Sequence, residues 1–566
     1  MARSGSARPG RRRGGATLIA MILMTGHAAS PAAGQCPSPL LAKDAPGAAG
    51  DRLGASVSID GRWAVAGAPT MDVPGHPATD TGAVLLYHDD GSAWTRVDTI
   101  APPGLLAGDE FGAAVALLGD VLVVGAPGSD ASGQNVGAVH VFRRAAPGAA
   151  FVLEATLGPG LSGPLSLQPG DALGRTLDLG PDRILAGAPR QDAQGIDSGA
   201  AYLFERVGAA WSRVTRLLAS DGSTGDQFGA AVALDQGRAL IGAPRHDAPF
   251  NDAGAAYAFV FDGAAWTFDA KLSAPVPGAA DSFGASVDLS AGRALVGAPL
   301  DDDRGADSGA AHVFVRVGSS WSHEAALQPA SLRAGDVFGN PVRLEGDTAV
   351  VAAALSDEVA LDGGCFHVFR LAAGAWTTGA GPTAPGAQPN DSFAAALALS
   401  APDARGARHV VVGASTDDRP GAPDAGSVSF FVDRAIILAQ PTNDWEVQGA
   451  GNAAFSVDAL TAGAATFRWR RAGVDLVDGP SPGGGTISGA RSRTLRIASP
   501  GPLDAASYDC VVGEPCGTLL VSGSATLTVG PGGNAPAPCP GDASGDGFVD
   551  FADIISALSN WSRSCP

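Results

Sequence analysis

Seven near-copies of one unit fill most of this chain, and the repetition strongly limits the folds open to it. The stretch GDQFGAAVALDQGRALIGAP (225–244) returns as ADSFGASVDLSAGRALVGAP (280–299), 55 residues later. Because one such unit cannot bury its own apolar faces, neighbouring copies must pack on one another. Each copy opens with an Asp two residues before a Phe or Leu: Asp51, Asp109, Asp171, Asp226, Asp281, Asp336 and Asp391.

Each copy has the pattern of a small antiparallel sheet. Four short strands are predicted in each copy. They are an alternating run, an apolar run ending in GAP, a second alternating run and a run that starts near an aromatic residue. Four-stranded sheets repeated seven times favour a seven-bladed β-propeller, and a β-solenoid is the alternative. Copy seven lacks its last strand. Leu40 and Leu41, which precede copy one, are expected to supply it and so close the ring.

The repeated motifs resemble the FG-GAP repeat, which forms the blades of the integrin α-chain propeller and occurs in many secreted bacterial proteins. The resemblance covers residues 39–434 and implies a β-propeller there. FG stands at Phe111-Gly112, Phe228-Gly229, Phe283-Gly284 and Phe338-Gly339. GAP stands at Gly67–Pro69, Gly125–Pro127, Gly187–Pro189, Gly242–Pro244 and Gly297–Pro299.

The loops after GAP carry pairs of acidic or amide residues. Family members that bind cations use a denser loop, D-x-D-x-D-G-x-x-D, and two carboxylates are few for an ion that takes six to eight oxygens. We therefore favour turns in which these side chains accept backbone N–H groups, with Asp301-Asp302-Asp303 as the best candidate for an exception. The pairs are Asp72/Asp80, Asp130/Asn135, Asp192/Asp197, Asp247/Asp252, Asp302/Asp307, Asp357/Asp362 and Asp418/Asp424.

The N-terminus and the charge indicate an exported protein. Residues 1–34 have a basic start, an apolar stretch and small residues, as in a secretory signal peptide. No other stretch is apolar enough to span a membrane. A net charge of −20 disfavours nucleic acid as a partner. Six cysteines fit an oxidising compartment, although Cys36 and Cys365 have no evident partners.

The sequence pattern changes after the repeats, over residues 436–530. Trp469 together with Asp504, Tyr508 and Cys510 resembles an immunoglobulin-like sandwich with its tyrosine corner. Val457 stands where that family carries its other cysteine. The spacing instead suggests a local disulfide between Cys510 and Cys516. A ligand-binding module and a spacer are both open for this domain, and we favour the spacer.

The C-terminus has the pattern of a calcium loop. Residues 531–538 form a Pro/Gly-rich linker, and residues 539–566 hold GDASGDGFVDFADIISALSNW, which fits an EF-hand loop followed by a helix. The unit resembles a single dockerin repeat, which implies a cohesin-like or cell-surface partner, and Cys539 and Cys565 bracket it as a candidate disulfide. The expected calcium ligands are Asp542, Ser544, Asp546, Phe548 through its carbonyl, Asp550 and Asp553.

These features together predict an all-β, secreted or surface-associated recognition protein. We expect it to bind a protein or carbohydrate ligand, to use calcium as its cofactor and to lack enzymatic activity, because no catalytic constellation is evident. A dockerin-tagged enzyme that degrades polysaccharides and a structural envelope or matrix component are the alternatives. An active site would break the symmetry of the copies at one end of the channel.

Overall fold

The structure is a computed structural model that describes residues 40–530, apart from 46, 74–78, 92, 132, 248, 359, 379–387, 404–406, 434–435, 462–464 and 514–518. The predicted all-β class is confirmed, since the only helices in these ranges are two 3-10 turns, Gly163–Leu165 and Pro502–Asp504. No helix in the described part of the chain is both long and apolar enough to cross a membrane.

Each of the seven copies folds into one four-stranded antiparallel sheet, here numbered 1 to 7 in copy order. The first strands are β2 (Ser56–Asp60), β6 (Ala114–Leu118), β10 (Thr176–Gly180), β14 (Ala231–Asp235), β18 (Ser286–Ser290), β22 (Phe338–Glu345) and β26 (Ala396–Leu399). The second strands, which end in GAP or its equivalent, are β3 (Trp63–Ala68), β7 (Val121–Ala126), β11 (Arg183–Ala188), β15 (Arg238–Ala243), β19 (Arg293–Ala298), β23 (Thr348–Ala353) and β27 (His409–Ala414).

The third and fourth strands complete each sheet. The third strands are β4 (Ala83–Asp89), β8 (Ala138–Arg143), β12 (Ala200–Val207), β16 (Ala255–Phe261), β20 (Ala310–Val317), β24 (Cys365–Ala372) and β28 (Ser427–Val432). The fourth strands are β5 (Trp94–Ile100), β9 (Val152–Leu157), β13 (Ala210–Leu217), β17 (Trp266–Leu272), β21 (Ser320–Leu327), β25 (Ala375–Thr378) and, in sheet 7, β1 (Leu40–Asp44).

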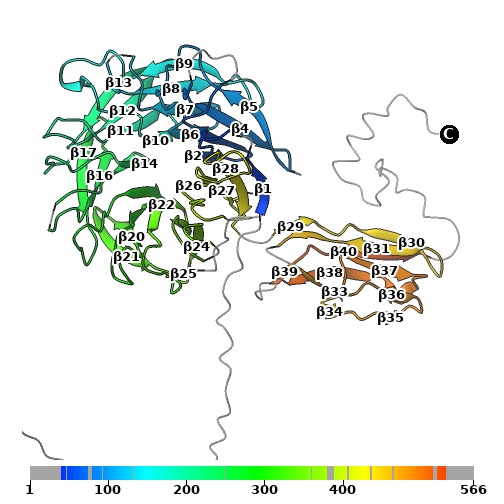
Figure 1. Cartoon of the computed structure of the whole chain (residues 1–566). Helices are drawn as coiled ribbons and strands as arrows, with labels where there is room; N and C mark the ends of the chain where they lie inside the picture. Colours follow the sequence, from blue (N-terminus) through cyan, green and yellow to red (C-terminus); the bar gives the residue numbers. More distant parts are fainter. Residues whose placement is uncertain are drawn as a thin grey trace, which may run out of the picture. The chain divides into compact units, whose positions relative to one another are not determined.

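The first strands of the seven sheets gather around a common centre (Figure 1). Contacts between neighbouring first strands run without a break from β2 through β6, β10, β14, β18 and β22 to β26, and from β26 back to β2. Sheet 7, which contacts both sheet 6 and sheet 1, contains strands from the first and the last part of the repeat region. As the sequence predicts, β1 pairs with β28 and supplies the missing fourth strand of sheet 7.

The FG and GAP motifs form the contact between neighbouring sheets. A Cβ added to Gly242 of one GAP would lie 1.9 Å from the carbonyl oxygen of Gly284, the FG glycine of the next copy. Gly284 itself has φ +92°, a conformation that side chains with a Cβ rarely adopt. The two glycines therefore let adjacent backbones touch, while the preceding Phe283 is fully buried beneath them.

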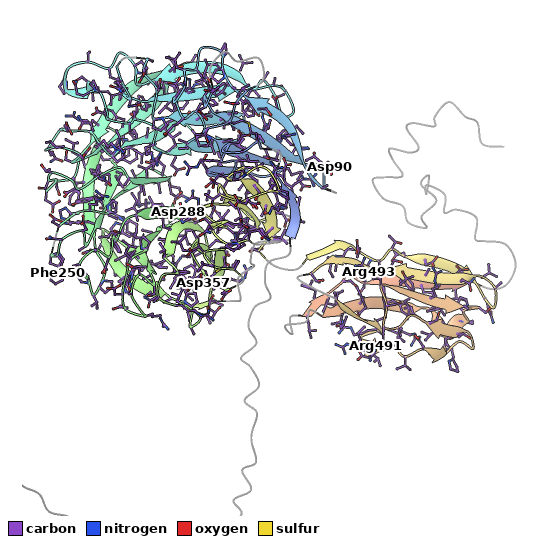
Figure 2. The ribbon with its side chains drawn as sticks, in the orientation of Figure 1. Asp90, Phe250, Asp288, Asp357, Arg491 and Arg493 are labelled. Atoms are coloured by element: carbon purple, nitrogen blue, oxygen red, sulfur yellow. The ribbon has the colours of Figure 1, made fainter. Side chains whose placement is uncertain are left out.

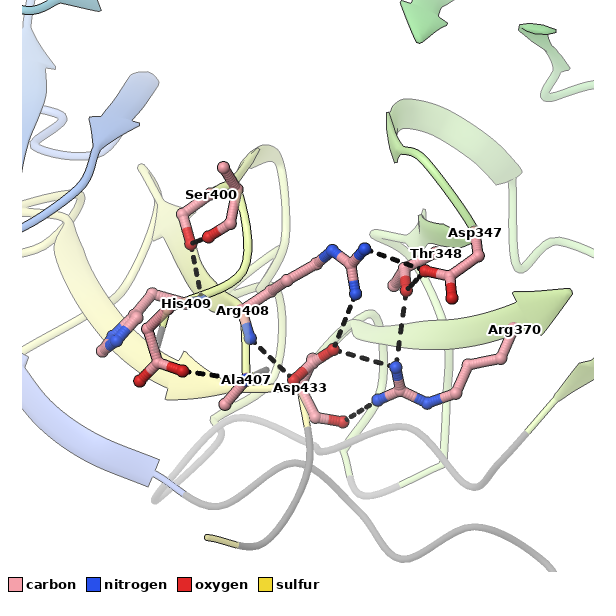
Figure 3. A network of polar contacts seen from close by, with 10 residues as sticks. Asp347, Thr348, Arg370, Ser400, Ala407, Arg408, His409 and Asp433 are labelled. Atoms are coloured by element: carbon pink, nitrogen blue, oxygen red, sulfur yellow. Dashed lines mark hydrogen bonds and ion pairs between the residues drawn. The ribbon is translucent and has the colours of Figure 1, made fainter. Parts of the chain in front are cut away.

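A buried ion-pair network holds the end of the last repeat strand (Figure 3). Asp433 follows β28 directly, and its Oδ2 accepts a hydrogen bond from Arg370 Nη1 of sheet 6 at 2.9 Å. Its Oδ1 accepts the backbone N–H of Arg408, whose guanidinium in turn donates to Asp347. Asp433 and Arg408 are buried, whereas Asp347 is exposed. Because each buried charge is paired, the network fixes sheet 7 against sheet 6.

The remaining strands lie between Ile436 and Gly530 and form two main sheets and a short pair. One sheet has the order β30-β40-β38-β33-β34 with β39 on β38, the other is β31-β37-β36-β35, and β29 pairs with β32. The strands are β29 (Ile436–Ala439), β30 (Asp444–Val447), β31 (Asn452–Ser456), β32 (Asp458–Leu460), β33 (Thr466–Arg471), β34 (Val474–Asp475), β35 (Gly479–Pro480), β36 (Thr486–Ser488), β37 (Thr494–Ala498), β38 (Ala506–Gly513), β39 (Leu519–Val521) and β40 (Ala525–Gly530).

The core of these sheets contains the residues that the sequence singled out. Trp469 is fully buried and lies opposite Cys510 in the β33–β38 pair. The Tyr508 hydroxyl donates to the backbone oxygen of Asp504 at 2.7 Å, which is the hydrogen bond of a tyrosine corner. Cys510 is buried and has no disulfide partner among the described residues. Its predicted partner Cys516 lies outside them, so the disulfide between the two stays a prediction.

Candidate functional site

The acidic pairs after GAP are turn residues, as the sequence predicts. In all seven loops the first carboxylate accepts the backbone N–H of the second residue, for example Asp302 Oδ1 from Asp307 N at 2.8 Å. The second residue has a positive φ throughout, such as +52° at Asp307, which Asp and Asn tolerate better than most residues. Geometry of this kind accounts for the repeated acidic pairs without a cation.

The Asp that opens each copy is buried and also binds backbone. Asp171 Oδ2 accepts the N–H of Gln168, three residues earlier, and the other six copies repeat this bond. Burial raises the pKa of the Asp171 carboxyl to about 6. In sheet 5, burial likewise raises the pKa of Asp301 to about 6. Among the described residues, no group of three or more His, Cys, Asp or Glu side chains is placed to hold a metal ion.

One copy adds a longer polar network to this pattern. In sheet 4, His246 Nδ1 lies 2.9 Å from Asp226 Oδ2, and its Nε2 lies 2.6 Å from Lys271 Nζ. Lys271 also donates to Asp221, which accepts the Tyr257 hydroxyl. Both ring nitrogens of His246 are thus engaged by neighbouring side chains, so the network joins β17 to the loop before β14.

A cysteine–histidine contact that the sequence analysis missed lies in sheet 6. Cys365 Sγ is 3.6 Å from His367 Nε2, two residues along the same strand. Both residues are buried, and burial raises the pKa of the Cys365 thiol to about 12. A thiol with that pKa is protonated at neutral pH and is a poor nucleophile. The i, i+2 spacing in a strand is the signal that would have found the pair.

The most irregular region is the centre of the ring of sheets. A cavity of about 200 Å³ is lined by residues of all seven first strands and their approaches. The position directly after the FG pair lies on its rim. Five copies have alanine there, whereas copy three has Arg175 and copy six has Asn340. The Arg175 side chain is 58 % exposed and forms a 3.4 Å ion pair with the exposed Glu110.

One layer further along the first strands, the strand registers align seven equivalent residues. They are Ser58, Ala116, Asp178, Ala233, Asp288, Arg343 and Ala398. Three of the seven are charged, and Asp288 lies toward the middle of the ring (Figure 2). Symmetry among the copies is therefore broken along the first strands of sheets 3, 5 and 6.

Polar residues of the first strands tie neighbouring sheets together. Asp178 Oδ2 accepts the N–H of Leu234 in sheet 4, and Asp288 Oδ2 accepts that of Leu344 in sheet 6. Burial raises the pKa of Asp178 to about 6 and that of Asp288 to about 7, and the Arg343 guanidinium opposes both shifts. These carboxylates satisfy strand-edge N–H groups that would otherwise face the channel unpaired.

A second hollow, of about 490 Å³, adjoins the cavity. The two share Arg175 and Ala230, and the hollow continues over the loops that carry Pro127, Asn135 and Arg190. Cavity and hollow thus lie at the same end of the channel, where the first strands begin. The sequence predicts that an active site would break the symmetry of the copies at one end of the channel, but it does not single out these residues.

The predicted calcium ligands cannot be placed. Asp542, Ser544, Asp546, Phe548, Asp550 and Asp553 lie outside the described residues, as do Cys539 and Cys565 and the predicted signal peptide at 1–34. The calcium site and the second disulfide therefore remain predictions from the sequence.

Comparison with known proteins identifies the repeats. The FG-GAP repeat model matches residues 38–87, 94–142, 211–259, 266–314 and 321–369. No curated protein matches the chain. Similar solved structures include the Ig1-2 module of the Drosophila receptor protein tyrosine phosphatase DLAR, with 29% identity, a TM-score of 0.16, and coverage of 18% of this chain and 53% of that chain.

Two further solved structures have comparable scores. The titin M10–obscurin-like 1 Ig complex has 22% identity and a TM-score of 0.15, with 18% of this chain and 97% of that chain covered. The Ig-like domain of human leucine-rich repeat-containing protein 4 has 20% identity and a TM-score of 0.14, with 18% and 90% covered. The chain spans about half the length of the DLAR module.

Proposed function

The chain carries FG-GAP repeats, which are typical of extracellular recognition or adhesion proteins, and we propose that it is a secreted, non-enzymatic recognition protein built on a seven-bladed β-propeller. The ligand is a protein or a glycan, bound at the end of the channel where the first strands begin. The observation that carries this proposal is the cavity at that end, which gathers Arg175, Asn340 and Arg343 from two sheets and has no His, Cys, Asp or Glu among its lining residues.

Three features support the propeller. The seven sheets are of equal strand number, their first strands contact one another in an unbroken series, and β1 joins β28. Closure of this kind leaves few exposed strand edges, which suits a protein that works outside the cell. An immunoglobulin-like sandwich over 436–530 completes the folded part of the proposal. Its support is the Tyr508–Asp504 hydrogen bond and the buried Trp469.

Binding without catalysis is favoured by the state of the polar groups. The His246 network has its nitrogens engaged, and Cys365 is a buried, high-pKa thiol. Asp178 and Asp288 each hold backbone N–H groups with both oxygens. Groups that are engaged in this way stabilise the fold and are not free to act as a nucleophile or general base.

A calcium-binding C-terminal unit completes the proposal and rests on the sequence alone. Asp542, Ser544, Asp546, Asp550 and Asp553 are spaced as in an EF-hand loop. Isothermal titration of the full mature chain with calcium tests it. We expect one tight site that Asp546→Ala removes and that Asp302→Ala, in a repeat loop, leaves intact. Equal binding by Asp546→Ala and the unaltered protein would contradict the calcium unit.

The recognition function is tested by affinity capture with the full mature chain. Envelope and culture-medium fractions of the source organism are passed over the unaltered protein, Arg175→Glu and the control Arg304→Glu, an exposed arginine of sheet 5 that lines neither hollow. We expect specific partners to be lost with Arg175→Glu alone. Partners that survive both substitutions but disappear with Asp546→Ala would move recognition to the C-terminal unit and refute the proposal.

A further inference from the structure

Two arginine side chains belong to the lining of the cavity at the end of the channel. They are Arg175 on the rim and Arg343 from the next layer, and they line the cavity together with Ser56, Thr176, Ser286 and Asn340. No carboxylate belongs to the lining, because Glu110 lines only the neighbouring hollow. Most of the other lining residues are alanine or valine, so few polar groups of the protein compete for the guanidinium groups. An anionic group is therefore the chemistry that this cavity complements.

Arg343 has hydrogen-bonding capacity left over. Its Nη1 donates to the carbonyl of Val342 at 2.8 Å, and within the described residues no other hydrogen bond of this guanidinium is seen. A guanidinium carries five N–H donors in a planar fork that matches the two oxygens of a carboxylate. The side chain is partly buried and reaches the cavity, so its unused donors are available to a group that enters from the rim.

The two acidic residues nearest Arg343 do not satisfy that capacity. Asp288 Oδ2 accepts a hydrogen bond from the N–H of Leu344, and its Oδ1 accepts one from the N–H of Leu289. Asp178 is engaged in the same way by Leu234 and Leu179. Neither forms an ion pair with Arg343, although both interact with it electrostatically. The arginine thus balances buried charge and still presents its donors to the cavity.

The lining of the cavity favours a polypeptide carboxylate over a sugar acid. The cavity itself, of about 200 Å³, has room for one acidic side chain. No aromatic residue lines the cavity, so there is no flat apolar surface for a sugar ring to pack against. We propose that the cavity receives the carboxylate of an Asp or Glu side chain of a protein partner, held by Arg343 and guided by Arg175. This inference rests on the proposed recognition function and specifies its ligand chemistry.

Titration calorimetry of the full mature chain at low ionic strength tests the proposal with three probes. These are N-acetyl-Gly-Glu-Gly-amide, its Gln counterpart, which has the same shape without the charge, and glucuronate. We expect the Glu peptide to bind at least 10-fold more tightly than the Gln peptide, because charge-assisted bidentate hydrogen bonds are lost with the charge. Glucuronate is expected to bind more weakly than the Glu peptide.

Variants assign the binding to the two arginines. Arg175→Gln should weaken the Glu peptide roughly 3-fold or more, whereas the control Arg304→Gln should not change it. Arg343→Gln is combined with Asp288→Asn, so that one of the two buried carboxylates that Arg343 balances is removed with it. This pair of substitutions should weaken binding of the Glu peptide at least 10-fold. Thermal unfolding of each variant checks that the ring is intact.

Several results would overturn the inference. Equal affinity for the Glu and Gln peptides would refute recognition of a carboxylate. Tighter binding of glucuronate would refute a polypeptide ligand. Unchanged binding by Arg343→Gln/Asp288→Asn would show that the peptide does not bind in the cavity. The probes report on the cavity without any partner. Glu-peptide binding that depends on Arg343, combined with partner capture that ignores Arg175→Glu, therefore upholds the carboxylate site and refutes only the proposed use of this surface.

Discussion

The phenylalanine of the FG pair allows a sharp test of how the sheets hold together. Phe283 is fully buried between sheets 4 and 5, and its ring meets Phe314 edge-on, with centroids 6.1 Å apart. Replacing it by alanine leaves a cavity where two backbones already touch through glycine and so have little freedom to collapse. The change should therefore destabilise the whole ring rather than one sheet.

The expected magnitude follows from the buried area. A buried aromatic side chain covers roughly 150–250 Å², which at about 25 cal/mol per Å² corresponds to about 4–6 kcal/mol. Measured Phe→Ala changes in cores fall at about 3–5 kcal/mol, and we expect Phe283→Ala in that range. Phe283→Leu should cost only about 1 kcal/mol. Leucine already fills the equivalent, fully buried site in copies one and three, at Leu53 and Leu173.

The assay is urea unfolding of the full chain, followed by tryptophan fluorescence. Trp321 in sheet 5 packs against the core that contains Phe283 and reports its loss. Trp266 in sheet 4 packs against the neighbouring core, between sheets 3 and 4, and reports whether the loss spreads. The free energies of unfolding of the Ala and Leu variants are compared with that of the unaltered protein. Two results would refute this reasoning: Phe283→Leu lowers stability as much as Phe283→Ala, or neither variant shifts the unfolding transition. In either case the Phe283 side chain is not what holds sheets 4 and 5 together.

Three further outcomes are expected. Tyr508→Phe should lower the stability of the sandwich by about 1–2 kcal/mol, since it removes the hydroxyl that donates to the Asp504 carbonyl; an unchanged melting temperature would refute this. Asp302→Ala should cost about 1 kcal/mol by removing the cap on Asp307 N, and added calcium should not alter that loss in thermal melts. The pKa of Asp171 is raised by burial to about 6 in the folded state, so its contribution to stability is fully present below about pH 4 and is lost as the pH rises through about 6. Melting temperatures between pH 4 and 8 should therefore vary less in Asp171→Asn than in the unaltered protein, and an equal slope would count against a raised pKa.

Much of the architecture was predictable because each strand and turn depends on residues close together in the sequence, and the same pattern recurs in every copy. Alternation and turn residues in each copy specify four strands, and the missing fourth strand of copy seven pointed to Leu40 and Leu41, which do pair with β28. The acidic pairs were predictable as turns for the same reason, since an Asx turn involves only residues a few positions apart. The pattern D-x-x-x-Y-x-C likewise contains both partners of the Tyr508–Asp504 hydrogen bond.

The candidate site was not predictable, because it is made by packing between copies. Arg175 and Asn340 occupy the same position in copies three and six, and Arg343 follows Asn340 by three residues. Only the packing of the sheets brings β10 and β22 to one cavity. Sequence alone shows that these copies differ from the others, but not that the differences face one another.

The sequence by itself therefore determined the repeating unit, its strands and turns, and the closing strand, because each depends on neighbours along the chain. Tertiary structure decided why FG and GAP recur together, through the contact of Gly242 with Gly284. It also decided that Asp178 and Asp288 serve strand-edge N–H groups of the next sheet, and that Arg343 is left with donors to spare. Each of these depends on which atoms of one copy meet the backbone of another, and that is fixed only when the sheets pack.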